Sequence, residues 1–147
     1  MYELSNVSIV IVSFNSEEKL FELFPSIPES CELIIVNNAS NSLPQELKKS
    51  RDFIEIHNSE NKGFGTACNI GVTKASKDFI FLLNPDTFLK DHCLENLLKV
   101  CKDFPNASAF TPKITDKKNK EDFKRRSILL DRGQWLNCLL YTSDAAD

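Results

Sequence analysis

The run Val7-Ser8-Ile9-Val10-Ile11-Val12 decides the fold of this chain. Its residues are mostly β-branched and almost continuously apolar, which is typical of a strand buried on both faces of a parallel sheet. Comparable runs follow along the chain, and a further strand is expected around 107–111. The intervening runs are Leu33–Val36, Ile54–His57 and Phe79–Leu83.

Helical patterns separate the predicted strands. A polar, acidic start at Asn15–Glu18 leads into an apolar stripe that ends at Pro25, and Pro44 opens a short helix that ends near Lys49. Longer helices are predicted over Gly63–Ala75 and Asp91–Phe104. Because strands and helices alternate, the sequence predicts an α/β fold, a three-layer sandwich with a mainly parallel sheet.

Composition excludes several classes of protein. The 147 residues carry 18 basic and 21 acidic side chains, a net charge of −3, which supplies no field for nucleic acid. No stretch approaches the length of a membrane span or of a secretion signal. We therefore expect a cytoplasmic protein with no nucleic-acid partner and no membrane span. The cysteines form no C-x-x-C pair and are interpreted as reduced, core-filling thiols: Cys31, Cys68, Cys93, Cys101 and Cys138.

Polar clusters follow four of the predicted strands. In open α/β sheets, ligands bind at the carboxyl ends of the strands, where such loops gather. This coincidence is the strongest indication of function that the residues give by themselves. The clusters are Ser13-Phe14-Asn15, Asn37 to Ser40, Asn61 to Gly65 and Asn84-Pro85-Asp86.

The glycine cluster allows two interpretations. Gly63 and Gly65 permit a tight turn and close backbone approach, and the following helix offers N–H groups to an anion. As a dinucleotide fingerprint the cluster fails, since Cys68 stands where the third glycine belongs and the cluster follows the third strand. An NAD-dependent oxidoreductase is therefore disfavoured, and close helix–sheet packing and a ligand site both remain open.

The cluster Asn84-Pro85-Asp86 is equally ambiguous by itself. A carboxylate directly after a buried strand suits a divalent cation, which takes oxygen ligands and bridges to substrate phosphates. Asn-Pro and Pro-Asp are also favoured turn dipeptides, so a plain turn is the simpler interpretation.

Taken together, the four clusters resemble family 2 glycosyltransferases with the GT-A fold, in particular the rhamnosyltransferase-like branch. Family members show a Phe/Tyr-Asn turn after the first strand, then "VDNAS", "N-x-GFG-x-A-x-N-x-G" and "LLNPD". The counterparts here lie in the same order and cover about Ser5 to Thr115. They are Val12–Asn15, Val36–Ser40, Asn61–Gly71 and Leu82–Thr87.

The resemblance implies the Rossmann-like half of the fold, which binds a nucleotide-diphosphate sugar such as dTDP-rhamnose or a UDP-sugar. It places Asp86 as the ligand of a divalent cation, Mg²⁺ or Mn²⁺, with Asn84 at the first acidic position of the family's D-x-D motif. It also implies transfer to a glycan or lipid-linked acceptor with inversion at the anomeric carbon. The remaining residues implied to contact the nucleotide sugar are Ser13, Asn15, Asn37, Asn38, Ser40, Asn61, Gly63, Phe64, Gly65 and Asn69.

The chain departs from the family pattern in two ways. The Asp of "VDNAS" is Asn37, whose amide offers a nucleobase a different pattern of donors and acceptors. No counterpart of the family's catalytic base precedes Asn137, and we interpret the acidic candidates as solvated loop charges. Those candidates are Asp116, Glu121, Asp122 and Asp131. The alternative function is accordingly a noncatalytic nucleotide-binding α/β module.

Residues 138–147 (CLLYTSDAAD) resemble the translation of a sequencing adapter rather than native sequence. We expect residues 1–137 to be the N-terminal part of a truncated glycosyltransferase domain, inactive by itself, followed by a non-native tail. For the full-length protein, a position at the inner face of the membrane is left open.

Overall fold

The computed structural model describes residues 2–39, 42–115 and 128–131. Within these residues, six strands form one mixed sheet in the order β3-β2-β1-β4-β6-β5. The strands are β1 (Val7–Ser13), β2 (Glu32–Asn38), β3 (Ile54–Asn58), β4 (Phe79–Leu83), β5 (Ala109–Phe110) and β6 (Ile128–Asp131). β1 lies between β2 and β4 and runs parallel to both, so every residue of β1 is buried, as its continuous apolar run predicts.

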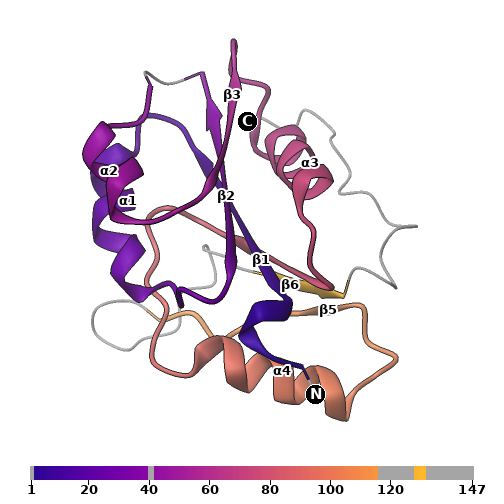
Figure 1. Ribbon diagram of the computed structural model, residues 1–147. Helices are drawn as coiled ribbons and strands as arrows, with labels where there is room; N and C mark the ends of the chain where they lie inside the picture. The colour runs from indigo at the N-terminus through magenta and orange to yellow at the C-terminus, as the bar shows by residue number, and fades with distance from the viewer. Residues whose placement is uncertain (1, 40–41, 116–127, 132–147) are drawn as a thin grey trace.

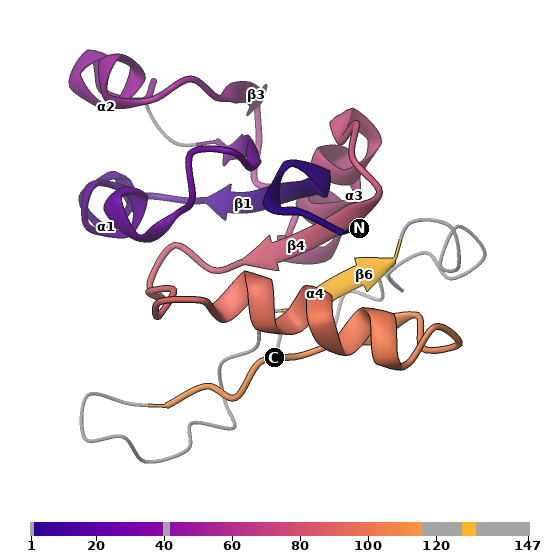
Figure 2. The same cartoon turned by 60° about the horizontal axis from the view of Figure 1, so that its bottom comes forward.

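Helices cover both faces of the sheet, and the predicted three-layer α/β architecture is confirmed. α1 and α2 lie on one side of the sheet and α3 on the other, as Figure 1 and the turned view in Figure 2 show. α4 packs on the same face as α1 and α2. The helices are α1 (Glu17–Leu23), α2 (Gln45–Ser50), α3 (Phe64–Lys74) and α4 (Cys93–Asp103), with short 3₁₀ turns η1 (Leu4–Asn6) and η2 (Phe24–Ser26).

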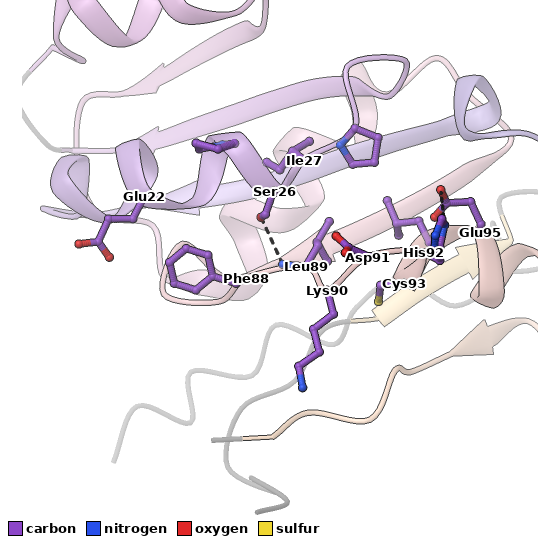
Figure 3. Close-up of a pocket in the computed structure, with 13 residues that line it drawn as sticks. Glu22, Ser26, Ile27, Phe88, Leu89, Lys90, Asp91, His92, Cys93 and Glu95 are labelled. Carbon is purple, nitrogen blue, oxygen red and sulfur yellow. Dashed lines mark hydrogen bonds and ion pairs between the residues drawn. The ribbon is translucent and has the colours of Figure 1, made fainter. Parts of the chain in front are cut away.

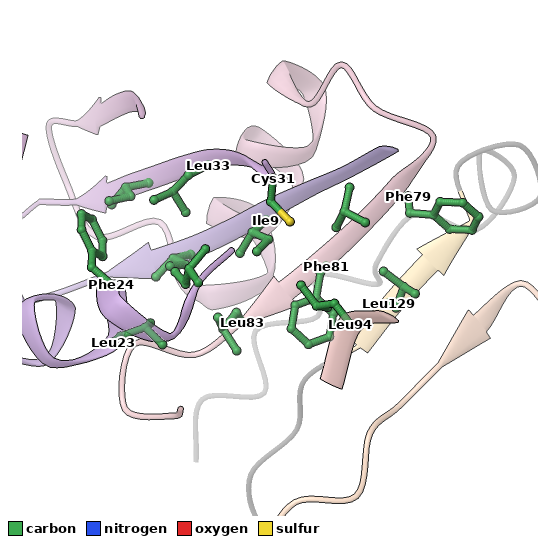
Figure 4. Packing of buried hydrophobic residues seen from close by; sticks show 14 of the residues in the cluster. Ile9, Leu23, Phe24, Cys31, Leu33, Phe79, Phe81, Leu83, Leu94 and Leu129 are labelled. Carbon is green, nitrogen blue, oxygen red and sulfur yellow. The ribbon is translucent and has the colours of Figure 1, made fainter. Parts of the chain in front are cut away.

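Two hydrophobic clusters flank the sheet, because successive side chains of a strand point to opposite faces. On β1, Ile9 and Ile11 face the cluster with α1, α2 and α4, whereas Val10 and Val12 face α3. On β4, Phe81 belongs to the first cluster, and Figure 4 shows it beside Leu94 of α4.

α3 packs unusually close to the sheet. A Cβ atom added at Gly71 would lie 2.4 Å from Cγ1 of Val10 and 3.0 Å from Cγ2 of Val36. Ala67 and Cys68 are also buried in this contact, and burial raises the pKa of the Cys68 thiol to about 12. Gly71, the last residue of the Asn61–Gly71 motif, therefore serves close helix–sheet packing.

The far edge of the sheet differs from expectation. β6 was not predicted, and it runs antiparallel between β4 and β5. β5 forms where a strand was expected, but it is limited to two residues because it pairs with β6 at only two positions. Asp131 lies in β6, so its interpretation as a loop charge was wrong. In the part of the chain that the structure describes, none of the helices has the length and apolar character needed to cross a bilayer.

At the amino ends of the strands, the carboxylate of Glu32 gathers several hydrogen bonds. It accepts hydrogen bonds from the buried hydroxyl of Ser8, from the Ser76 backbone N–H (2.9 Å) and from the Ser76 hydroxyl (2.6 Å). The Lys77 N–H donates in turn to the Ser8 hydroxyl at 3.2 Å. Partial burial alone would raise the pKa of Glu32, but the hydrogen bonds from Ser76 and Ser8 and the charge of Lys77 outweigh it and lower the pKa.

Arg51, which is positively charged, forms hydrogen bonds at the same edge of the sheet. Its guanidinium donates to the carbonyl oxygens of Ile27 and Pro28, both at 2.8 Å, and of Cys31 at 2.9 Å. These bonds tie the end of α2 to the segment that leads into β2. Glu32 and Arg51 thus satisfy the backbone and hydroxyl groups of this edge with charged side chains.

Candidate functional site

A cavity of about 410 Å³ opens at the carboxyl ends of the strands. We call it the carboxyl-edge pocket. It is lined by Val12 at the end of β1, Asn38 at the end of β2, Asn61 after β3 and the segment Asn84–Asp86 after β4. The topology therefore brings together four parts of the chain that are far apart in sequence, at the position where open α/β sheets bind ligands.

A chain of asparagine side chains forms one wall of this pocket. The Asn58 amide donates to Oδ1 of Asn38 at 3.0 Å, and the Asn38 amide donates to Oδ1 of Asn61 at 2.7 Å. Backbone N–H groups of Lys62 and Gly63 complete the chain, donating to Oδ1 of Asn38 (3.1 Å) and of Asn61 (2.9 Å). The ends of β2 and β3 and the start of α3 are thus held by neutral amide groups.

The backbone at this edge uses conformations that few residues adopt. Gly63, which immediately precedes α3, has φ +76°, and a non-glycine residue there would be strained. Asn15 (φ 49°) and Ala39 (φ 71°) also lie in the left-handed region, directly after β1 and β2. Residues with such backbone conformations are often found at binding sites, where the loops set the shape of the pocket.

The segment after β4 is both a turn and a wall of the pocket. The Thr87 N–H and hydroxyl both donate to the carbonyl oxygen of Asn84, at 3.3 Å and 2.6 Å, which closes a tight turn around Pro85. Asp86 lies within this turn and lines the pocket. The two interpretations of this cluster are therefore compatible, because Asp86 belongs to the turn and also lines the cavity.

The pocket contains about half of the residues predicted to bind a nucleotide sugar. Six of them line it: Asn38, Asn61, Gly63, Phe64, Asn84 and Asp86. The others do not line it. Ser13 and Asn37 are fully buried in the sheet, Asn15 is exposed beside β1, and Gly65 and Asn69 lie on α3. Ser40 lies outside the described residues, as do Asp116, Glu121, Asp122 and the tail 138–147.

Ser13 connects to the pocket through a neighbour. Its hydroxyl lies 3.0 Å from the hydroxyl of Ser16, which lines the pocket and also accepts a hydrogen bond from the Phe14 N–H at 3.2 Å. Ser16 was not predicted as a site residue, although its position directly before the first helix is a signal that could have indicated it.

Lys19 is a second lining residue that was not predicted. It lies in the first turn of α1, where Glu17 and Glu18 dominate the local pattern, so a single lysine gives no sequence signal. Phe14 and Phe64 also line the pocket and are half exposed, at 49% and 54%. Exposed aromatic rings at a cavity offer flat apolar surfaces to a ligand.

The donor set at the pocket fits the implied divalent cation. Asp86 supplies a carboxylate and Asn84 an amide oxygen, the oxygen donors that Mg²⁺ and Mn²⁺ prefer. Among the described residues, no group of three or more His, Cys, Asp or Glu side chains could hold a metal ion by itself. The residues therefore suit a cation that shares its coordination with phosphate oxygens of a ligand.

A second hollow, of about 510 Å³, lies between the end of α1 and the segment that joins β4 to α4 (Figure 3). The hydrogen bond from the Leu89 N–H to the Ser26 hydroxyl, 3.2 Å, holds its two sides together. Its lining carries three carboxylates, from Glu22, Asp91 and Glu95, and Lys90 as a cation. This charge disfavours a phosphate ligand, and none of the residues predicted to bind the nucleotide sugar lies there.

The fold and the pocket define a class of protein. A mainly parallel α/β sheet with a cavity at the carboxyl ends of its central strands is the architecture of doubly wound ligand-binding domains. Within that class, the model of glycosyl transferase family 2 matches residues 8–144, and the chain belongs to this family.

Similar proteins support this assignment. Poly-beta-1,6-N-acetyl-D-glucosamine synthase of Staphylococcus aureus (strain COL) is 28% identical over 125 residues, which cover 78% of this chain and 30% of that protein. The low-salt glycan biosynthesis hexosyltransferase Agl10 of Haloferax volcanii is 25% identical over 118 residues, covering 78% of this chain and 38% of the relative. The chain thus spans about a third of the length of the relatives it matches.

Solved structures confirm the GT-A fold. The mannosyltransferase PcManGT from Pyrobaculum calidifontis, in complex with GDP-Man and Mn²⁺, matches with a TM-score of 0.72 at 14% identity, over 88% of this chain and 45% of that one. S. aureus TarS 1-349, in complex with UDP-GlcNAc, matches with a TM-score of 0.61 at 17% identity, over 71% of this chain and 33% of that one.

Proposed function

We propose that this chain is the donor-binding part of an inverting glycosyltransferase, which binds a nucleotide-diphosphate sugar for transfer to a glycan or lipid-linked acceptor. One observation carries the proposal. The polar motifs that follow β2, β3 and β4 line a single pocket at the carboxyl edge of the sheet, with Asp86 as its carboxylate.

In the proposed complex, the nucleoside lies toward the ends of β1 and β2. Phe14 offers a ring face there, and the wall of Asn38 and Asn61 offers amide groups. The diphosphate lies toward Gly63 and Asp86. Asp86 and Asn84 would hold a divalent cation, which would offset part of the diphosphate's negative charge.

The proposed reaction is a direct displacement. The acceptor hydroxyl oxygen forms a bond to the anomeric carbon while the bond from that carbon to the β-phosphate oxygen breaks. The bonding electron pair leaves with the nucleoside diphosphate, and the hydroxyl proton passes to a carboxylate base. Among the described residues that line the pocket, Asp86 is the acidic one, and it is assigned to the cation. We therefore propose that the base comes from outside the described part and that the chain is inactive by itself.

The donor is proposed to be dTDP-rhamnose or a UDP-sugar. The motifs at Val36–Ser40 and Leu82–Thr87 resemble the rhamnosyltransferase-like branch. The similar structures were solved with UDP-GlcNAc and with GDP-Man, so guanine is the competing base to test. For the complete enzyme we propose a cytoplasmic reaction at the inner face of the membrane.

Calorimetry tests the proposal directly. The 147-residue chain is titrated with UDP, dTDP and GDP, each in the presence of Mn²⁺ and again with EDTA. We expect one of the diphosphates to bind only with the cation, and Asp86→Ala to abolish that cation-dependent binding. Asp103→Ala, at the exposed end of α4, is the matched control and should bind as the unchanged chain does.

Two outcomes contradict the proposal. Binding of NAD without any response to metal would point to an oxidoreductase, and failure of all three diphosphates to bind would remove the donor site. A separate experiment distinguishes an enzyme from a noncatalytic module. The gene is extended past codon 137, and sugar transfer by the longer protein supports the enzyme, whereas a native stop codon there supports the module.

A further inference from the structure

We infer that Lys19 is a phosphate-binding residue of the carboxyl-edge pocket. The donor's diphosphate would lie between this positively charged residue and the negatively charged Asp86. The inference rests on the proposed function, because it assigns a further residue of that same site. It starts from the lining of the pocket. Among the described residues that line it, Lys19 of α1 is the basic one and Asp86 the acidic one.

The amine of Lys19 is available to a ligand. Its side chain is exposed, and it forms no ion pair with any described carboxylate, although Glu22 follows one turn later on α1. A lysine side chain that no neighbouring carboxylate holds can offer its three N–H donors to an anion that enters the pocket.

The balance of charges explains why such a residue is needed. A sugar diphosphate carries one negative charge on each phosphate, while Asp86 and a divalent cation together contribute a single net positive charge. Lys19 contributes the second positive charge, so the occupied pocket becomes neutral. When the sugar leaves, additional negative charge develops on the diphosphate, and an amine already in place stabilises it without rearrangement.

The position of Lys19 also fits this role. α1 begins immediately after the turn at Ser13–Ser16, so its first turn lies at the carboxyl edge, next to Phe14 and Ser16 in the lining of the pocket. Lys19 therefore lines the pocket from the helix that follows β1, whereas Asp86 lines it from the turn that follows β4. A diphosphate between them would be held by residues from the connections that follow two neighbouring strands.

The test compares ligands that differ only in phosphate. Uridine, UMP and UDP are titrated with Mn²⁺ by NMR and calorimetry, with the thymidine series in parallel, against the unchanged chain, Lys19→Ala and Lys19→Arg. We expect Lys19→Ala to weaken diphosphate binding about tenfold and monophosphate binding less, and to leave nucleoside binding unchanged. Lys19→Arg should stay within about threefold, since the charge is kept. Lys74→Ala, on the exposed last turn of α3, is the matched control.

The outcomes separate this inference from the proposed function. If Lys19→Ala binds the diphosphate normally while Asp86→Ala loses cation dependence, the role of Lys19 is wrong and the donor site stands. If Lys19→Ala weakens binding of the nucleoside as much as binding of the diphosphate, the residue shapes the pocket and does not bind phosphate. If no diphosphate binds the unchanged chain, both proposals fall. Identical thermal melts of the variants exclude misfolding as the cause.

Discussion

The two edges of the sheet satisfy their polar groups in opposite ways. At the amino edge, the ionised side chains of Glu32 and Arg51 accept or donate several hydrogen bonds each and close the turns against the strands. At the carboxyl edge, neutral amides of Asn58, Asn38 and Asn61 form the network, and a pocket lies beside it.

This difference separates stability from binding. At the amino edge, the charged groups of Glu32 and Arg51 find their hydrogen-bond partners within the protein. At the carboxyl edge the network is neutral, and the charges that line the pocket, Lys19 and Asp86, belong to residues outside that network. A network of neutral amides therefore holds this wall of the pocket without adding a charge to it.

The largest expected effect comes from placing a charge in the neutral network. Asn58→Asp replaces the amide that donates to Asn38 by a nearly isosteric carboxylate, and Asn58 is only 6% exposed. We expect a loss of about 2–3 kcal/mol in the free energy of unfolding at pH 7, because a buried charge then faces an acceptor. The protonated carboxyl group can donate to Asn38, so its folded-state pKa is raised and the loss shrinks as pH falls.

Denaturant titrations between pH 7 and pH 4 measure this change. Asn58→Ala is the control, since it removes the donor without adding a charge and should lose about 1 kcal/mol at every pH. If the loss of stability in Asn58→Asp does not change with pH, a buried charge in the asparagine network is not its cause.

The next effect concerns α3, which joins the two edges. In Gly71→Ala, helix propensity favours alanine by about 1 kcal/mol, but the new methyl group would lie 2.4 Å from Val10. We expect overpacking to dominate, with a net loss of about 1–2 kcal/mol and a lower Tm. Thr73→Ala, exposed on the same helix, should change stability by less than about 0.5 kcal/mol. A rise in Tm for Gly71→Ala would show that the close contact relaxes at no cost.

The smallest expected effect is at the amino edge and depends on pH. Glu32→Gln should cost about 1 kcal/mol at pH 7, since an ionised acceptor makes stronger hydrogen bonds than an amide. The folded-state pKa of Glu32 lies below its ordinary value of 4.5. The contribution is therefore complete above that value and is lost as pH falls through the folded-state pKa, where the two proteins should converge in stability.

Chemical unfolding at pH 7 and at steps below pH 4.5 measures the convergence. Glu55→Gln, which removes a surface ion pair with Lys48 (2.7 Å), is the control and should cost less than about 1 kcal/mol. If the free energies of unfolding of Glu32→Gln and of the unchanged chain differ by the same amount at all pH values, ionisation of this carboxylate does not cause the loss of stability at low pH.

The central part of the fold was predictable because burial imposes it locally. β1 and β4 are covered on both faces, so their apolar runs are continuous, and the glycine and proline signals mark the starts of α3 and α2. β6 escaped prediction for a physical reason. Its apolar core is three residues long and follows a highly charged stretch, and its pairing partners, β4 and β5, precede it by many residues. The direction of a strand at a sheet edge is set by pairing with strands that are distant in sequence. This pairing produces no pattern in the local sequence.

The site was predictable as a set of loops and less so residue by residue. Asn37 and Asn38 are adjacent, chemically identical and both buried, yet Asn38 lines the pocket and Asn37 does not, because successive side chains of β2 point to opposite faces of the sheet. Lys19 and Ser16 enter the pocket because α1 turns its first residues toward the sheet edge. That orientation depends on how Leu20 and Leu23 pack in the core, which a local motif does not contain.

The place of β6 in the sheet has a consequence for the order of assembly on the ribosome. The backbone pairing of the parallel segment β3-β2-β1-β4 involves no residue beyond Leu83, so it can begin while the rest of the chain is still being made. Among the described strands, β5 pairs with β6, so this pairing must wait until Asp131 has emerged. During that interval the free side of β4 is an unpaired apolar edge, the kind of surface that seeds aggregation. Expression conditions that slow synthesis between these two points would lengthen the exposure.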